Sequence, residues 1–372
     1  MYSIYIHIPF CKKKCNYCAF NSKVAENLEI ENYVDALTAE IKNRAASEKA
    51  DTIYFGGGTP SILNLSQFEK IFDALKKNFV IEKNSEITAE INPGTVTENF
   101  LCELKNLGFN RLSFGCQSFN DNILKILGRI HNSKTALETV STAGKFFENI
   151  SIDLMYGLPS QTLENLREDL KIISTLDIQH ISIYGLEIEE GTKFFELNQQ
   201  NKLNLPNDEI VSEMYDFIFE KIPALGFNRY EISNFAKKNF ESRHNSGYWT
   251  GKNYFGFGAG AHSFFKNLRT SNICNVETYI KKIRAGENIS EVEEILTEKN
   301  FIEEFCFLGL RMTEGISTKI FQEKFGKNIF DIYGEVLEKY FKLNLLKFEG
   351  DRIFFTSQGF KVSNIILADF LL

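Results

Sequence analysis

The sequence predicts an α/β fold in which a parallel sheet curls toward a barrel and a smaller, mostly helical domain follows. Two observations carry this prediction. From residue 1 to about residue 235, short apolar strand patterns alternate with amphipathic helix patterns, which is typical of βα units in a parallel sheet. From about Val276 the pattern becomes mostly helical. With 372 residues, of which 43% are hydrophobic and 24% charged, the chain can bury a substantial core.

Six strands are predicted in the first part of the chain. Each is short, is rich in Ile, Phe, Tyr or Ser, and ends near a Gly, Pro or Asn. They are Ile4–Ile8, Thr52–Phe55, Ile87–Ile91, Arg111–Phe114, Ser151–Met155 and Ile181–Leu186. In such a sheet the functional side chains collect at the C-terminal ends of the strands.

Amphipathic runs between the strands predict the covering helices. We expect helices at Ile30–Ala46, Leu65–Asn78, Thr97–Leu107 and Leu163–Leu176. In the second of these, one stripe at helical spacing is formed by Phe68, Ile71, Phe72 and Leu75. Ser66 followed by Glu69 has the pattern of a capping box at the start of this helix.

Changes in composition divide the chain into three parts. Residues 1–235 carry the βα alternation. Residues 236–275 are rich in Gly and aromatic residues, with five Gly between Asn239 and Ser263, and we expect an ordered functional loop there. Residues 276–372 are predicted as a helical domain with a β-hairpin, in which Leu345–Phe348 and Arg352–Thr356 flank a turn. Helices followed by such a hairpin resemble a winged helix.

Charge and targeting signals narrow the class of protein. The 49 acidic residues outnumber the 42 basic ones, and the net charge of -7 argues against a protein that mainly grips nucleic-acid backbones. The first ten residues lack the features of a signal peptide, and no apolar stretch reaches the ~18 residues of a membrane helix. We therefore expect a cytoplasmic protein without a transmembrane segment, and we leave peripheral membrane contact open.

Three of the seven cysteines form the most specific motif in the sequence. Cys11, Cys15 and Cys18 follow the first predicted strand with the spacing C-x3-C-x2-C. Three thiolates on one tight loop can each hold one iron of a [4Fe–4S] cube, which leaves the fourth iron open for a small molecule. A structural zinc site is the weaker alternative because it needs four ligands, and the only nearby candidate for a fourth is His7, inside a strand.

The run from Tyr5 to Cys18 resembles a radical S-adenosylmethionine (SAM) protein. More narrowly, it resembles the coproporphyrinogen oxidase-like group, which contains the oxygen-independent coproporphyrinogen III oxidases and the HemW-type haem chaperones. The resemblance extends over nearly the whole chain through several independent motifs. It implies a partial (β/α) barrel of radical SAM type with a smaller, mostly helical, winged-helix-like C-terminal domain. It also implies that the open cluster iron binds the amino and carboxylate groups of SAM.

The resemblance implies a SAM site at the strand ends. The second strand ends in a glycine triplet, where the missing Cβ atoms let the backbone approach a ligand. Glu90 ends the third strand, and a carboxylate there can accept hydrogen bonds from both ribose hydroxyls. An ion pair between Asp153 and Arg129 is a compatible structural role for those two residues. The SAM contacts implied by the resemblance are Tyr5, Tyr17, Gly57, Gly58, Thr59, Glu90, Gln117, Arg129 and Asp153.

A last motif, His-Asn-x-x-Tyr-Trp, lies in the Gly- and aromatic-rich part. Imidazole binds haem iron and flat aromatic rings pack on a porphyrin, so this combination suits a macrocycle. The motif resembles the one associated with haem binding in the HemW branch. It implies haem contacts by His244, Asn245, Tyr248 and Trp249. A purely structural role for His244 is the alternative interpretation. His262, in the same segment, is the alternative candidate for the haem ligand.

The resemblance implies a haem chaperone that hands haem to acceptor haemoproteins, with the cluster and SAM controlling assembly or transfer. The alternative is an oxygen-independent coproporphyrinogen III dehydrogenase. Two departures count against this alternative. The oxidases carry a further cysteine two positions after the third cluster cysteine, where this chain has Phe20, and they carry an extension ahead of the first strand.

A nucleic-acid-modifying radical SAM enzyme is the third hypothesis, suggested by the winged-helix-like tail. Residues 297–372 contain 10 Lys and Arg against 11 Asp and Glu, which is a poor composition for phosphate binding. We therefore expect haem and haemoproteins as partners, and no nucleic acid.

Overall fold

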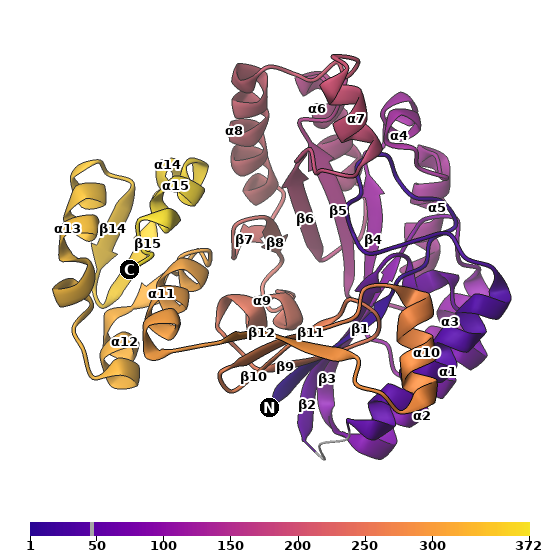
Figure 1. The fold of residues 1–372 in the computed structure, drawn as a ribbon. Helices are drawn as coiled ribbons and strands as arrows, with labels where there is room; N and C mark the ends of the chain where they lie inside the picture. The colour runs from indigo at the N-terminus through magenta and orange to yellow at the C-terminus, as the bar shows by residue number, and fades with distance from the viewer. Residues whose placement is uncertain (45–47) are drawn as a thin grey trace.

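The computed structural model describes residues 1–44 and 48–372, and a twelve-stranded sheet dominates it (Figure 1). The sheet has the order β12-β11-β10-β9-β1-β2-β3-β4-β5-β6-β8-β7. Its six central strands run parallel, and consecutive strands pair. They are β1 (Tyr2–Ile8), β2 (Lys49–Gly57), β3 (Val80–Ile91), β4 (Arg111–Gln117), β5 (Ile150–Tyr156) and β6 (His180–Gly185). Since β1 pairs with β9 and β6 with β8, the barrel stays open, and the predicted α/β partial barrel is confirmed.

The helices of this part of the chain pack mostly on the outer face of the barrel. They are α1 (Asn27–Asn43), α2 (Leu65–Asn78), α3 (Glu98–Leu107), α4 (Asp121–Leu127), α5 (Ser133–Ala143), α6 (Leu163–Ile173), α7 (Lys193–Gln199) and α8 (Asp208–Ala224). The end predicted for the first helix, at Ala46, lies outside the described residues. The predicted cap of α2 is wrong by two residues. The Asn64 side chain, not that of Ser66, accepts a hydrogen bond from the Gln67 backbone N–H, and the Asn64 backbone N–H donates to Gln67 Oε1, so the helix begins at Leu65.

The central strands alternate between an apolar outer face and a polar inner face. Outward residues such as Ile4, Ile53 and Leu112 are fully buried under the helices. Inward positions carry polar side chains that lie next to one another in register, as Glu90 and Ser113 do. A polar barrel interior cannot serve as the hydrophobic core, so the core lies between sheet and helices and the interior is left for a polar ligand.

Residues 236–275 do not form the loop expected from the sequence. After β7 (Asn228–Arg229) and β8 (Asn234–Ala236), the chain forms helix α9 (Arg243–Trp249) and strands β9 (Tyr254–Phe257), β10 (His262–Phe265) and β11 (Leu268–Asn272). Strand β9 pairs in parallel with β1, and β10 and β11 continue the sheet. The loop expectation failed because this pairing joins segments about 250 residues apart, which local composition does not reveal.

The C-terminal part has its own hydrophobic core and its own small sheet, of order β13-β15-β14. Its elements are α11 (Glu298–Gly309), β13 (Ile316–Ser317), α12 (Thr318–Phe325), α13 (Ile329–Lys342), β14 (Leu346–Glu349), β15 (Arg352–Phe355), α14 (Ser357–Lys361) and α15 (Ser363–Ala368). The predicted hairpin is thus present as β14 and β15. The second core begins with α11 and not at residue 276, because α10 (Val276–Ala285) packs on α1 and β12 (Ser290–Ile295) belongs to the large sheet.

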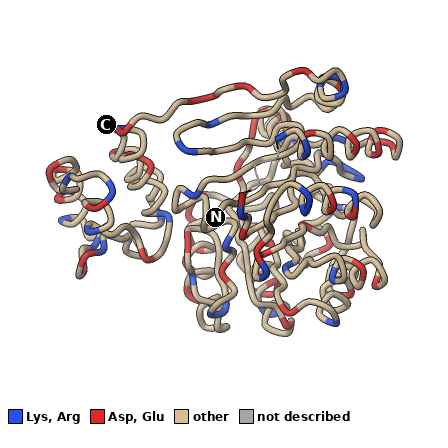
Figure 2. Tube along the Cα trace, turned by 90° about the horizontal axis from the view of Figure 1, so that it is seen from below, with Lys and Arg blue, Asp and Glu red and all other residues tan. Residues whose placement is uncertain are grey.

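Lysine and arginine are interspersed with aspartate and glutamate along the trace in Figure 2. Among the described residues, no helix has the length and apolar character needed to cross a bilayer.

Candidate functional site

The C-terminal ends of the six central strands surround a cavity of about 390 Å³. Most of the residues predicted for the cluster and for SAM line it together: Cys11, Cys15, Tyr17, Cys18, Gly57, Gly58, Thr59, Glu90, Gln117, Arg129 and Asp153. Asn245 of the expected haem motif lines it as well. Tyr5 does not. It lies one layer deeper, where its hydroxyl is bonded to His7 Nδ1 at 3.0 Å and its ring stacks on Tyr54.

The loop with the three cysteines is fixed by hydrogen bonds on both sides. The Thr59 hydroxyl donates to Cys11 Sγ and an Arg129 guanidinium N–H donates to Cys15 Sγ, each at 3.3 Å. Between the second and third cysteines, the Asn16 backbone N–H donates to Leu127 O at 3.0 Å. Among the described residues, no three His, Cys, Asp or Glu side chains are grouped around a single-ion site, and His7, the candidate zinc ligand, bonds to Tyr5 and Asn21 instead. Three thiols spread along a loop suit a multi-iron cluster better than one zinc ion.

The glycine triplet at the end of β2 packs against the start of the cysteine loop. Gly57 has φ +108°, and a Cβ there would lie 2.5 Å from His7 Cε1. A Cβ on Gly58 would lie 2.6 Å from Phe10 O, and the Gly58 N–H donates to Ile8 O at 2.8 Å. The sequence predicted that these glycines let a ligand approach the backbone. In the structure they also let the segment His7–Phe10 pack closely against them, so the triplet holds the cysteine loop at the cavity.

Two carboxylates face the cavity, Glu90 from β3 and Asp153 from β5, with β4 between them. Glu90 accepts a hydrogen bond from the Tyr54 hydroxyl at 2.8 Å, and burial raises the pKa of Glu90 to about 7. Asp153 accepts from Ser113 Oγ at 3.1 Å, and burial raises its pKa too. The expected ion pair of Asp153 with Arg129 is absent. Arg129 donates instead to Cys15, Asn92 and Gly115, which places its charge against the cysteine loop.

The four residues of the His-Asn-x-x-Tyr-Trp motif point to three places. His244 is 1% exposed, with Nδ1 bonded to Thr52 Oγ1 at 2.9 Å and Nε2 bonded to the Tyr248 hydroxyl at 3.0 Å. Asn245 faces the cavity described above. Trp249 lies in a second cavity of about 250 Å³, between α9 and the C-terminal part. The four side chains therefore do not line one common pocket.

Both ring nitrogens of His244 are engaged in hydrogen bonds in the folded chain, so the expected bond from His244 to haem iron stays a prediction that requires one of these contacts to break. Burial lowers the pKa of His244 to about 3, so the ring is neutral. It stacks on Tyr54 with ring centroids 4.9 Å apart, and the Tyr54 hydroxyl bonds to Glu90. His244 thus packs against Tyr54, which in turn orients the Glu90 carboxylate at the cavity.

Comparisons with known proteins match two separate parts of the chain. Residues 5–173 match the radical SAM superfamily, and residues 296–362 match the HemN C-terminal domain. The haem chaperone HemW of Bacillus subtilis (strain 168) is 40% identical over 379 aligned positions, which cover 100% of this chain and 99% of the relative. HemW of Lactococcus lactis subsp. lactis (strain IL1403) is 36% identical, with 100% and 97% of the two chains covered.

The chain belongs to the HemW family.

Membership in the radical SAM superfamily implies a [4Fe–4S] cluster and SAM. The coproporphyrinogen III oxidase HemN from Escherichia coli has the same fold, with a TM-score of 0.88 at 24% identity over 99% of this chain and 89% of that one. The family resemblance inferred from the cysteine, glycine and strand-end motifs is thereby confirmed.

Several residues of this HemW-family site were missed in the sequence. Arg111 is 1% exposed and its Nε and Nη1 have no hydrogen-bond partner among the described residues, yet its charge lowers the pKa of both Glu90 and Asp153 against the effect of burial. Other missed residues line the cavity: Tyr54, Asn92, Ser113, Ser182 and Tyr184. Each lies at an inward position of its strand or just beyond the strand end. Period-two alternation of polar with Ile or Phe residues is the signal that could have identified them.

Proposed function

We propose that this chain is a haem chaperone, which binds haem and transfers it to acceptor haemoproteins in the cytoplasm. The observation that carries the proposal is the full-length similarity, at 40% identity, to a relative named a haem chaperone. Haem is cargo in this proposal, and the cavity at the strand ends is the place for the resident cofactors.

We assign Cys11, Cys15 and Cys18 as the ligands of the [4Fe–4S] cluster. The fit is good because three thiols lie on one loop at the cavity, and two sulfurs already accept hydrogen bonds of the kind that tune cluster potentials. When bound, the cluster supplies an electron and an open iron site. Thr59 and Arg129 keep their sulfurs in position, and the Arg129 charge offsets that of the thiolates.

We assign the opposite wall of the cavity to SAM. Glu90 presents a carboxylate to the ribose hydroxyls and is held in orientation by Tyr54. Asp153 and Gln117 add polar contacts from the next two strands, and Tyr17 contributes a ring from the cysteine loop. Tyr5, which does not reach the cavity, acts through Tyr54.

Phe20 argues against coproporphyrinogen decarboxylation. It lines the cavity and is 68% exposed, at the position where the family resemblance implies a further cysteine in the oxidases. The cavity therefore carries an apolar ring where that enzyme class has a thiol. The structural likeness to HemN describes the fold and does not favour its reaction for this chain.

Anaerobic reconstitution followed by two assays tests the proposal. We expect haem titration to give a saturable Soret change, and coproporphyrinogen III supplied with SAM and a reductant to release no carbon dioxide. Carbon dioxide release without haem binding would contradict the chaperone function and favour the coproporphyrinogen III dehydrogenase.

A further inference from the structure

We propose that His262 is the axial ligand that this chain offers to haem iron. The inference rests on the proposed haem function and names the residue responsible. It starts from the accessibility of the five histidines. Four are buried and hold hydrogen bonds inside the fold: His7, His131, His180 and His244. The side chain of His262 is 57% exposed, so only its imidazole can reach an iron atom without unfolding.

A carboxylate orients the His262 ring for metal binding. Nδ1 lies 3.0 Å from Glu293 Oε2. An ionised carboxylate only accepts hydrogen bonds, so Nδ1 carries the proton and Nε2 keeps the free lone pair. Histidines that ligate metals commonly donate their other ring N–H to a carboxylate in this way, which fixes the tautomer and makes the ligating nitrogen more basic.

The position of Glu293 comes from an irregularity in the sheet. Strand β12 pairs with β11 so that Glu294 lies opposite Arg269 and Val292 lies opposite Thr270. Glu293 falls between these pairs as an extra residue, which is a β-bulge. Bulges change the direction of a side chain at a sheet edge, and here the bulge brings the carboxylate to a histidine two strands away.

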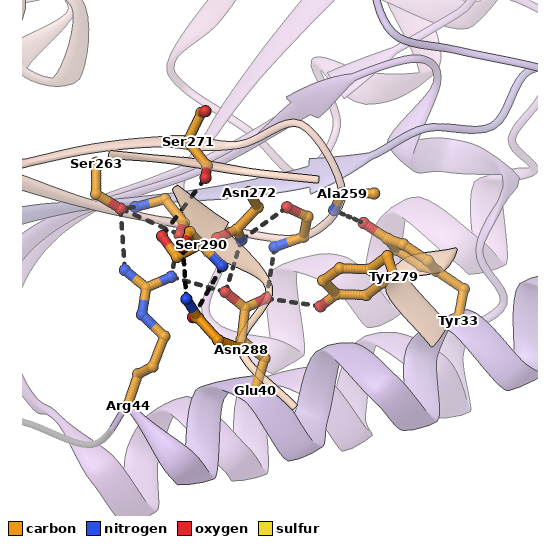
Figure 3. A network of polar contacts seen from close by, with 12 residues as sticks. Tyr33, Glu40, Arg44, Ala259, Ser263, Ser271, Asn272, Tyr279, Asn288 and Ser290 are labelled. Atoms are coloured by element: carbon orange, nitrogen blue, oxygen red, sulfur yellow. Dashed lines mark hydrogen bonds and ion pairs between the residues drawn. The ribbon is translucent and has the colours of Figure 1, made fainter. Parts of the chain in front are cut away.

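Hydrogen bonds hold the turn that precedes His262 against helix α1, and Figure 3 shows this network around Glu40 and Tyr33. The buried Glu40 carboxylate accepts hydrogen bonds from the Gly258 N–H at 2.8 Å and from Asn272 Nδ2 at 2.7 Å, on either side of β10. The Tyr33 hydroxyl accepts from the Ala259 N–H at 3.0 Å. Since the turn before His262 is held by groups from α1, the imidazole is positioned before any ligand binds.

His262 lies on the same side of the barrel as the cysteine loop. Asn21, three residues after Cys18, donates through Nδ2 to Ala259 O at 3.1 Å and to Cys274 O at 3.0 Å. These two bonds connect the end of the cysteine loop to the turn that leads into β10. A haem bound to His262 would therefore rest on a segment whose position depends on the cysteine loop, which gives the cluster a physical route to influence haem.

Haem titration of the reconstituted full-length protein tests this ligand. His262→Ala should remove the imidazole-type Soret band and raise the Kd for haem by at least tenfold. Glu293→Gln should keep the band and raise the Kd by about tenfold, the usual cost of losing a partner of a ligating histidine. Ser271→Ala, on the strand beside His262, is the matched control and should change neither quantity. Added imidazole should restore the band in His262→Ala.

Other outcomes would overturn the proposal. A band that changes only in His244→Ala would return the ligand to the buried motif. Haem binding by the parent protein with an unchanged band and Kd in His262→Ala would refute the ligand and leave the chaperone function standing. If the parent protein binds no haem, both the ligand and the function fail. Iron content and SAM binding of each variant show that the cofactor site is intact.

Discussion

Replacing Glu90 with glutamine tests the SAM site most sharply. The change removes a charge and keeps the shape, so the cysteine loop should load its cluster as before. If both ribose hydroxyls donate to the carboxylate, its loss should cost on the order of 1.5–3 kcal/mol, because hydrogen bonds to a charged acceptor are strong. That corresponds to a rise in the Kd for SAM of about 10- to 150-fold at pH 8.

The pH dependence follows from the raised pKa of Glu90, which burial moves from 4.5 to about 7. Below pH 7 the free protein holds Glu90 protonated, and binding to the carboxylate form must first remove that proton. In the parent protein the Kd should fall about fivefold from pH 6 to pH 7 and about tenfold from pH 6 to pH 8, where it levels off. In Glu90→Gln this slope should vanish.

Anaerobic equilibrium dialysis of SAM at pH 6, 7 and 8 measures both effects. Glu69→Gln, an exposed glutamate on α2, is the control and should retain the parent affinity and slope. An unchanged Kd at pH 8, or a slope that persists in Glu90→Gln, would remove Glu90 from the site.

Unfolding without SAM gives an independent check on the same residue. A carboxyl whose pKa is raised in the folded state contributes stability below its unfolded pKa of 4.5, and this contribution is lost as pH rises through about 7. Glutamine mimics the protonated form. The stability difference between Glu90→Gln and the parent should therefore move in favour of the variant between pH 5 and pH 8.

Three further predictions concern the cysteine loop, the buried histidine and the β9–β10 turn. Alanine at all three cluster cysteines should remove the brown absorbance and about four irons per chain, the count of a [4Fe–4S] cluster, and iron retention would contradict the ligand assignment. His244→Ala should weaken SAM binding severalfold by releasing Tyr54 while leaving the haem Soret band unchanged; a shifted band would contradict the structural role. Gly258→Ala should lower the free energy of unfolding more than Gly286→Ala does. Both glycines have positive φ, but a Cβ at Gly258 would lie 2.4 Å from the Tyr33 hydroxyl, whereas Gly286 has open space. Equal urea midpoints would refute this.

The central strands and their helices could be predicted because their signals are local. The outward Ile and Phe residues of β1 to β6 repeat with period two, and α2 carries its apolar stripe at helical spacing. The cysteine and glycine motifs followed for the same reason, since each lies within a few residues just after a strand.

The environment of His244 could not be predicted, since its partners come from elsewhere in the chain. Thr52 and Tyr54 lie on β2, about 190 residues earlier. Thr52 bonds to the His244 ring and Tyr54 stacks on it, so the ring is buried inside the fold. The glycines near Gly258 suggested a loop for a similar reason. They are required by the close approach of β9 and its turn to β1 and α1, which only the folded chain reveals.

Transfer of haem through direct contact tests the central claim. The reconstituted, haem-loaded protein is mixed with the haem-free form of a b-type cytochrome, or is separated from it by a dialysis membrane, and the Soret band of the cytochrome is followed in both arrangements. A chaperone should load the cytochrome much faster on mixing than across the membrane. Equal rates in the two arrangements, or no loading at all, would contradict haem transfer by this chain.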